Sequence, residues 1–247
     1  MMKQNSLFLS ITLFFTLNTF NLQAQSSRFK SVQANSFDLI IGGDFGYRLI
    51  DGNTNDSKIA EVIANRERFE NYKLNYRFGF NYYKGIGESL LAKIGIRFAN
   101  PGFSTGSIEP IDLQQNINEI DKIYQQRGTI YHYNYQIIEL PVGLRYIVSW
   151  SLCKPYVEAG VAPNIYWRTF IEEEHYQENH NTTIIEEPIN RFNFIGFLAT
   201  GGDFIISKHL SGFTQLVGRY QLNNLRTSEL EERILSMGFE VGIRFYP

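Results

Sequence analysis

Apolar and polar residues alternate along most of this chain with a period of two. The clearest stretch is residues 235–246, where Leu, Met, Phe, Val, Ile and Phe alternate with Ser, Gly, Glu, Gly, Arg and Tyr. Such alternation predicts a β-strand with one apolar and one polar face. The pattern predicts eight strands, near residues 37–49, 72–83, 90–98, 135–148, 154–168, 191–206, 210–220 and 235–246.

The alternation alone leaves two barrels open, because a soluble lipocalin-like barrel buries the apolar face and a membrane-spanning barrel exposes it to lipid. The interior of an eight-stranded barrel is only just wide enough for side chains, so it cannot hold the many large apolar side chains of these segments. No Asp, Glu, Lys or Arg falls on the apolar face. The polar face carries the small residues that a narrow interior needs, at Gly42, Gly46, Gly79, Gly95, Gly143, Gly160, Gly201, Gly238 and Gly242. We therefore predict an all-β fold, an eight-stranded antiparallel up-and-down transmembrane β-barrel.

The connections between the segments support this topology. Segments two and three, four and five, and six and seven are joined by a few residues each, while the other four connections run to about 14 to 36 residues. Outer membrane barrels have short periplasmic turns and long external loops. We therefore expect both termini to face the periplasm, and the aromatic girdles to contain Tyr72, Tyr82, Trp167, Tyr220 and Phe245.

Some residues disturb the regular pattern. Pro141 and Pro163 fall inside segments, where each removes a ladder donor, so we expect a bulge or a break at one or both. In segment 210–220, Phe213 and Val217 fall on the polar side, which leaves the register of that strand open.

The N-terminus has the features of a secretory signal peptide. Lys3 precedes an apolar stretch from Leu7 to about Leu17, and Leu22-Gln23-Ala24 forms a small-residue cleavage site. We expect residues 1–24 to be the signal peptide, residues 25–36 a periplasmic N-terminal segment and residues 37–247 the barrel domain. The single cysteine, Cys153, cannot form an internal disulfide and lies far from the cleavage site, so we expect no lipoprotein anchor.

Composition excludes several other classes of protein. The chain has 247 residues, 43% of them hydrophobic and 15% aromatic, which excludes a disordered chain or a disulfide scaffold. The mean hydropathy of −0.23 and the lack of a long apolar run beyond the first 25 residues exclude a helical membrane protein. The formal charge of −2 gives no reason to expect binding to nucleic acid.

Two adjacent stretches resemble a known group. Residues 135–146 (YQIIELPVGLRY) and 154–160 (KPYVEAG) are similar to the Bacteroidota outer membrane β-barrel family, which includes PorT-like proteins. The resemblance implies an eight-stranded outer membrane barrel; most members have no defined activity, and some PorT-like members support type IX secretion. The chain departs from such barrels in ending on Pro247, so recognition of the last strand by the assembly machinery would rest on Phe245 and Tyr246.

The polar face also carries charges of both signs. They are Asp38, Asp44, Glu139, Glu158, Asp203 and Glu240 with Arg48, Lys73, Arg77, Lys93, Arg97, Arg145, Arg168, Arg219 and Arg244. A single buried charge costs several kcal/mol, so we expect these residues to pair into networks that plug the barrel. The alternative is an ion path, which eight strands leave little room for.

Other candidate sites are weaker. The acid-rich loop from Ile171 to Glu187, with His175 and His180, matches no metal motif. Gly42 to Gly46 superficially resembles a phosphate-binding loop but has no helix after it. His132 is the one histidine near an external rim, and Ser104 or Thr129 would have to fold back to supply a nucleophile. We assign no catalytic, cofactor-binding or metal residues, and we expect no cofactor.

We therefore expect a non-enzymatic outer membrane protein with a plugged lumen, acting as an envelope-structural, binding or secretion-accessory component. The alternative is a lipid-modifying barrel enzyme of the lipid A acylase or deacylase kind. Expected partners are outer membrane lipid and envelope or secretion-system proteins, without nucleic acid, and we expect a monomer.

Overall fold

The computed structural model describes residues 35–52, 57–106, 129–148, 153–175, 180–184, 189–226 and 230–247. The predicted signal peptide, 1–24, and residues 25–34 of the predicted periplasmic segment lie outside the described residues. So do residues 176–179 and 185–188 of the acid-rich loop.

Eight antiparallel strand positions form a closed ring, as predicted. Its strands are β1 (Ser36–Asp51), β3 (Lys73–Gly85), β4 (Leu90–Ala99), β6 (Thr129–Glu139), β7 (Val142–Ile147), β8 (Cys153–His175), β10 (Phe192–Ile205), β11 (Leu210–Gln221) and β12 (Glu231–Phe245). β6 and β7 occupy one position between β4 and β8, β1 pairs with β12, and the pairing of β8 with β10 completes the ring. The protein is therefore an eight-stranded antiparallel β-barrel.

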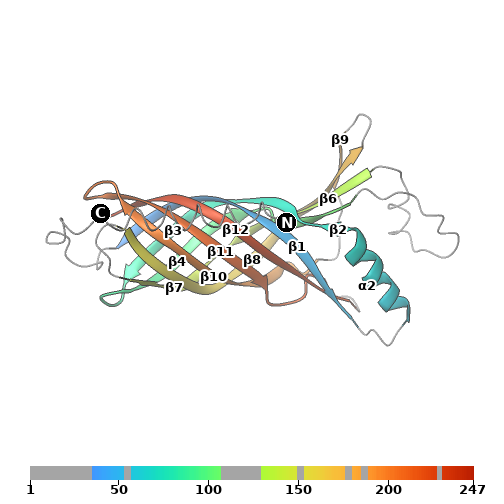
Figure 1. Cartoon of the computed structure of the whole chain (residues 1–247), viewed down its shortest axis with the longest axis horizontal. Helices are drawn as coiled ribbons and strands as arrows, with labels where there is room; N and C mark the ends of the chain where they lie inside the picture. The colour runs from blue at the N-terminus through green and yellow to red at the C-terminus, as the bar shows by residue number, and fades with distance from the viewer. Residues whose placement is uncertain are drawn as a thin grey trace, which may run out of the picture.

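The two ends of the barrel differ. The short connections from β3 to β4 and from β10 to β11 lie at the end where β12 finishes, which we call the turn end. The long connections lie at the opposite end, which we call the loop end. In Figure 1 the C-terminus marks the turn end, and helix α2 (Ser57–Phe69) and the tips of β6 and β9 (His180–Ile184) project at the loop end.

The barrel has its polar face inside and its apolar face outside, as predicted for a transmembrane barrel. On β12, for example, Met237 and Phe239 are exposed on the outside while Ser236 and Glu240 are buried. Exposed large apolar side chains surround the ring on every strand position. At both ends aromatic side chains join neighbouring strands: ring centroids lie 5.0 Å apart for Phe37 and Tyr82 at the turn end, and 5.0 Å apart for Tyr47 and Tyr72 at the loop end.

The predicted irregularity occurs at Pro141, where the fourth segment divides into β6 and β7. Leu140 and Pro141 belong to neither strand, although the Leu140 amide still donates to the Pro163 carbonyl at 2.8 Å and the Pro141 carbonyl accepts from the Gly95 amide at 2.9 Å. Pro163 stays within β8, and the register of β8 instead shifts four residues later, at Trp167. On β11, Phe213 and Val217 point inward and are buried, which settles the register that the sequence left open.

The loop end carries elements that the alternation did not predict. Helix α2 follows β1, and strands β2 (Glu70–Asn71) and β5 (Gly102–Thr105) pair with each other. β5 also pairs with β6, and β9 pairs with the part of β8 beyond the ring. The strands of the first three long connections, β2, β5 and β9, therefore join the ends of β6 and β8 in a sheet that continues from one side of the barrel.

Candidate functional site

The barrel interior is filled by three clusters of ion pairs, stacked from the turn end to the loop end. Each cluster includes one side chain from β1: Asp38, then Asp44, then Arg48. Because alternate residues of a strand share a face, these three residues mark successive levels along the barrel axis.

The cluster nearest the turn end contains three acids and three bases: Asp38, Glu158, Asp203, Lys93, Arg145 and Arg244. All six side chains are at most 1% exposed. The Arg244 guanidinium holds Asp38 through Nε at 2.7 Å and Nη2 at 2.8 Å, and its Nη1 contacts Asp203. This bidentate geometry is the strong form of an arginine–carboxylate pair.

Glu158 is the acceptor at the centre of that cluster. Its carboxylate accepts from Arg145 Nε at 2.7 Å, from the Tyr83 hydroxyl at 2.9 Å and from the Lys93 ammonium. The Arg145 guanidinium carbon lies 3.8 Å from the ring centroid of Tyr156 and 4.2 Å from that of Tyr83. Aromatic rings and ion pairs therefore close this level of the barrel together.

The middle cluster has the same balance, with Asp44, Glu139, Glu240, Arg77, Arg97 and Arg219. Arg77 links two acids, since its Nε donates to Asp44 at 2.6 Å and its Nη1 contacts Glu139. Arg219 donates to Asp44 at 3.1 Å and also contacts Glu240. Three positive and three negative charges thus neutralise each other inside the barrel, as burial requires.

The third cluster closes the loop end. Arg48 donates to Glu70 at 3.0 Å and to Glu232 at 3.2 Å, and Arg226 lies 3.5 Å from Glu232. Phe103 of β5 is fully buried, with its ring 4.5 Å from that of Tyr133 and 4.0 Å from the Arg48 guanidinium. Strands β2 and β5 therefore place an acid and an aromatic ring across the barrel mouth.

Small residues let the inner side chains fit. A Cβ on Gly160 would lie 2.7 Å from the Phe197 ring, and one on its cross-strand partner Gly143 would lie 3.1 Å from the same ring. The predicted role of the inward glycines is confirmed at this level.

Thirteen of the fifteen charged residues predicted for the lumen take part in these clusters. The predicted lumen position of Arg168 is wrong. The bulge at Trp167 reverses the alternation of β8, so that Arg168 lies on the outside and is exposed. Lys73 is half-buried at the loop end, where its ammonium donates to Asn134 at 2.6 Å and to Asn75 at 3.3 Å.

Three members of the loop-end cluster were not predicted. Glu232 continues the inward parity of β12, so beginning the predicted strand three residues earlier, at residue 232, would have identified it. Glu70 and Arg226 lie in connections without a periodic pattern, so alternation could not identify either of them.

The rim around His132 was the candidate for catalysis. His132 lies directly opposite Ser104 on β5 and opposite Glu172 on β8, so the three residues share a row on one face of the sheet. The His132 ring contacts Glu174 at 3.2 Å, and the Ser104 hydroxyl donates to the Tyr72 carbonyl at 3.2 Å. The fold brings serine, histidine and acid side chains together, but the serine and histidine side chains are engaged with other partners.

The acid-rich loop is part of a hairpin, in which Glu172, Glu173 and Glu174 pair with Thr182, Asn181 and His180 across β8 and β9. Among the described residues, no group of three or more metal-ligating side chains comes together. Within the same residues, no helix is long and apolar enough to cross a membrane.

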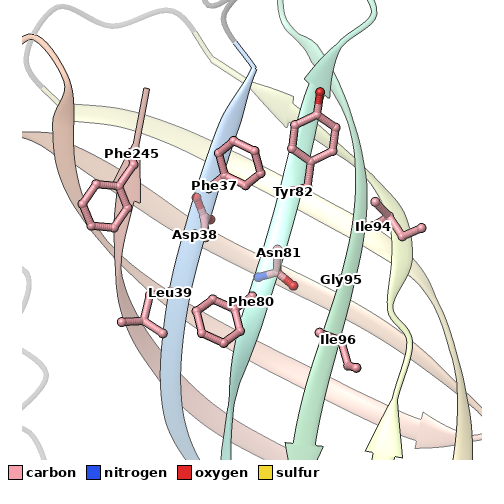
Figure 2. Close-up of a pocket in the computed structure, with 10 residues that line it drawn as sticks. All are labelled: Phe37, Asp38, Leu39, Phe80, Asn81, Tyr82, Ile94, Gly95, Ile96 and Phe245. Atoms are coloured by element: carbon pink, nitrogen blue, oxygen red, sulfur yellow. The ribbon is translucent and has the colours of Figure 1, made fainter. Parts of the chain in front are cut away.

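The outer wall near the turn end carries a shallow groove of about 520 Å³. Figure 2 shows its walls, formed by outward side chains of β1, β3, β4 and β12. They are Phe37, Leu39, Phe80, Tyr82, Ile94, Ile96 and Phe245. The groove is therefore part of the lipid-facing surface and is separate from the plugged interior.

No protein-family model and no curated protein matches this sequence. Among solved structures, Neisserial surface protein A is 8% identical, with 85% of this chain and 97% of that protein covered and a TM-score of 0.45. For the outer membrane protein OprG from Pseudomonas aeruginosa, the identity is 8%, the coverage 86% and 96%, and the TM-score 0.44. The outer membrane protease OmpT from Escherichia coli is 9% identical, with 90% of this chain and 100% of that protein covered and a TM-score of 0.43. Similarity at this level transfers no activity to this chain, and membership of the Bacteroidota family stays a prediction.

Proposed function

We propose that this protein is a non-enzymatic outer membrane protein that acts through its loop-end structure, as a binding, envelope-structural or secretion-accessory component. The observation that carries the proposal is the combination of a filled interior and a folded loop end. Charge-balanced clusters at three levels occupy the interior, and their side chains are buried. The loop-end sheet consists of β2, β5, β9 and the parts of β6 and β8 that extend beyond the barrel ring. It forms a folded surface outside the ring.

The loop-end sheet is well suited to hold a partner. β8 is 23 residues long, whereas the other barrel strands have at most 16. Its extra length pairs with β6 on one side and β9 on the other, so the sheet is continuous with the barrel wall. Binding residues are commonly carried by connections that a rigid scaffold holds in place. The resemblance to PorT-like proteins favours a secretion-system or other envelope protein as the partner.

The experiment is a deletion strain assayed for type IX export and for envelope permeability. It is complemented with the wild-type gene and with a variant in which an Asn-Gly turn replaces residues 107–128. Because β5 and β6 are paired neighbours, such a turn can join Gly106 to Thr129 and keep Phe103 in the barrel mouth. We expect the variant to reach the outer membrane at wild-type level and to fail in complementation.

The matched control shortens nothing at the loop end and replaces Lys208 and His209 in the turn from β10 to β11 by Asn-Gly. This control should complement fully. Full complementation by the loop variant, together with loss of function in the turn variant, would place the action at the turn end and refute the proposal.

The second candidate function is a lipid-modifying enzyme, favoured by the row of Ser104, His132 and Glu172. General-base catalysis by histidine needs a nucleophile within hydrogen-bonding reach. We expect His132→Ala to leave the acylation pattern of lipid A unchanged in mass spectra, with Ser104→Ala as the matched second variant. A changed pattern in both variants would favour the enzyme.

A further inference from the structure

The β-bulge on β8 places an aromatic and a basic side chain next to each other on the outside of the barrel. In regular strands, consecutive residues point to opposite faces. At Trp167 the pairing with β6 skips one residue, since Gln136 pairs with Arg168 and Ile137 pairs with Tyr166. Tyr166 consequently stays buried inside, whereas both Trp167, which is 72% exposed, and Arg168 lie outside.

These two residues lie at the loop-end rim of the membrane-facing wall. β10 pairs with β8 only as far as Phe192 and Ile165, and the last contact of this pairing is the hydrogen bond of 3.0 Å from the Tyr166 amide to the Arg191 carbonyl. The bulge comes directly after this point. Trp167 and Arg168 therefore sit where the barrel wall ends, at the level where aromatic residues mark a membrane–water interface.

The surface just below the bulge is apolar. Phe192 and Ile165 form a cross-strand pair there, with exposed fractions of 70% and 42%. Beside the bulge, Gln136 lies directly opposite Arg168 on the outer face of β6. A cation, an amide and an indole thus lie next to one another above an apolar strip.

Arg168 forms no ion pair with any residue in the described part of the chain. Arg233, another outward arginine at the loop end, is held by Glu231 at 2.8 Å and by the Tyr220 hydroxyl at 2.9 Å. Arginine pairs well with phosphate because its planar fork matches the phosphate oxygens.

We propose that Arg168, Gln136 and Trp167 bind the phosphorylated sugar headgroup of a glycolipid in the outer leaflet, while Phe192 and Ile165 contact its first acyl chain. The guanidinium and the amide would donate to a phosphate, and the indole would lie against the sugar at the interface. Charge complementarity supports a phosphorylated lipid, and the apolar strip below the cation supports a lipid over a free anion. The proposal rests on the proposed outer membrane location, but its test does not require the protein to be in cells.

The test uses the full mature chain reconstituted into phosphatidylcholine nanodiscs that contain lipid A as the probe. The bound lipid A per protein is measured by mass spectrometry after repurification. We expect Arg168→Gln to retain about fivefold less lipid A than the wild type, because one basic residue near an anionic lipid surface contributes ~1 kcal/mol. The matched control, Arg233→Gln, should retain as much as the wild type, because that arginine is already paired.

Trp167 supplies a second readout. In a Trp150→Phe background it is the single tryptophan of the chain. We expect its emission to shift when lipid A is present and to stay constant with dephosphorylated lipid A. Equal retention of lipid A by Arg168→Gln and wild type would overturn the proposal. So would a tryptophan emission shift with dephosphorylated lipid A as large as that with lipid A, or retention of phosphatidylglycerol by the wild type as strong as its retention of lipid A.

Discussion

Replacing Glu158 by leucine removes the carboxylate on which three donors of the turn-end cluster converge. Lys93, Arg145 and the Tyr83 hydroxyl all donate to it, and its side chain is fully buried. The variant would leave three bases facing two acids at this level. Removing one partner of a buried ion pair costs roughly 3 to 5 kcal/mol, because the remaining charge stays buried without compensation.

That loss is a large share of the ~5–15 kcal/mol that stabilises a typical domain. We would measure it by urea unfolding of the barrel in lipid vesicles, followed by tryptophan fluorescence. The exposed Glu231, which pairs with Arg233 at 2.8 Å, provides the matched control. Glu231→Leu should cost less than ~1 kcal/mol, as exposed ion pairs do.

A double substitution tests the charge argument directly. Lys93→Met combined with Glu158→Leu restores two bases facing two acids at the turn-end level, and both replacements keep the side-chain volume similar. We expect the double variant to be more stable than the sum of the two single losses predicts, with a coupling energy of about 1 to 3 kcal/mol. Additive losses, or a Glu158→Leu variant no less stable than Glu231→Leu, would refute the idea that the cluster is held by charge balance.

Three further predictions concern the whole barrel. The mature protein should fractionate with outer membranes and change mobility on SDS gels after boiling; recovery in the soluble periplasmic fraction would contradict the proposed location. A membrane-impermeant thiol reagent applied to intact cells should miss Cys153, which begins β8 at the turn end, and label a cysteine replacing Asn179; the opposite result would invert the predicted orientation. The purified protein should keep planar bilayers near baseline conductance, because ion pairs and aromatic rings fill the interior, and stable large channels would refute the plug.

The alternation of the chain was sufficient to predict the eight barrel strands and, except for segment 210–220, the face that each turns to lipid. The reason is that strand periodicity is local: a residue's face follows from its parity in the strand, as for Met237 outside and Glu240 inside. Parity also identified most of the buried charges. The same reasoning failed at Arg168, because a bulge depends on how two strands pair and leaves no mark in the pattern of one strand.

Only the tertiary structure decided which charges meet. Arg244 binds Asp38 across 206 positions of the chain, and Arg48 is joined to Glu232 across 184. Such partners are chosen by the closure of the ring, which brings the first strand beside the last. The loop-end elements were equally out of reach of the sequence pattern. Glu70 and Phe103 are held by contacts with Arg48 and Tyr133, because their own segments are too short to bury a face by themselves.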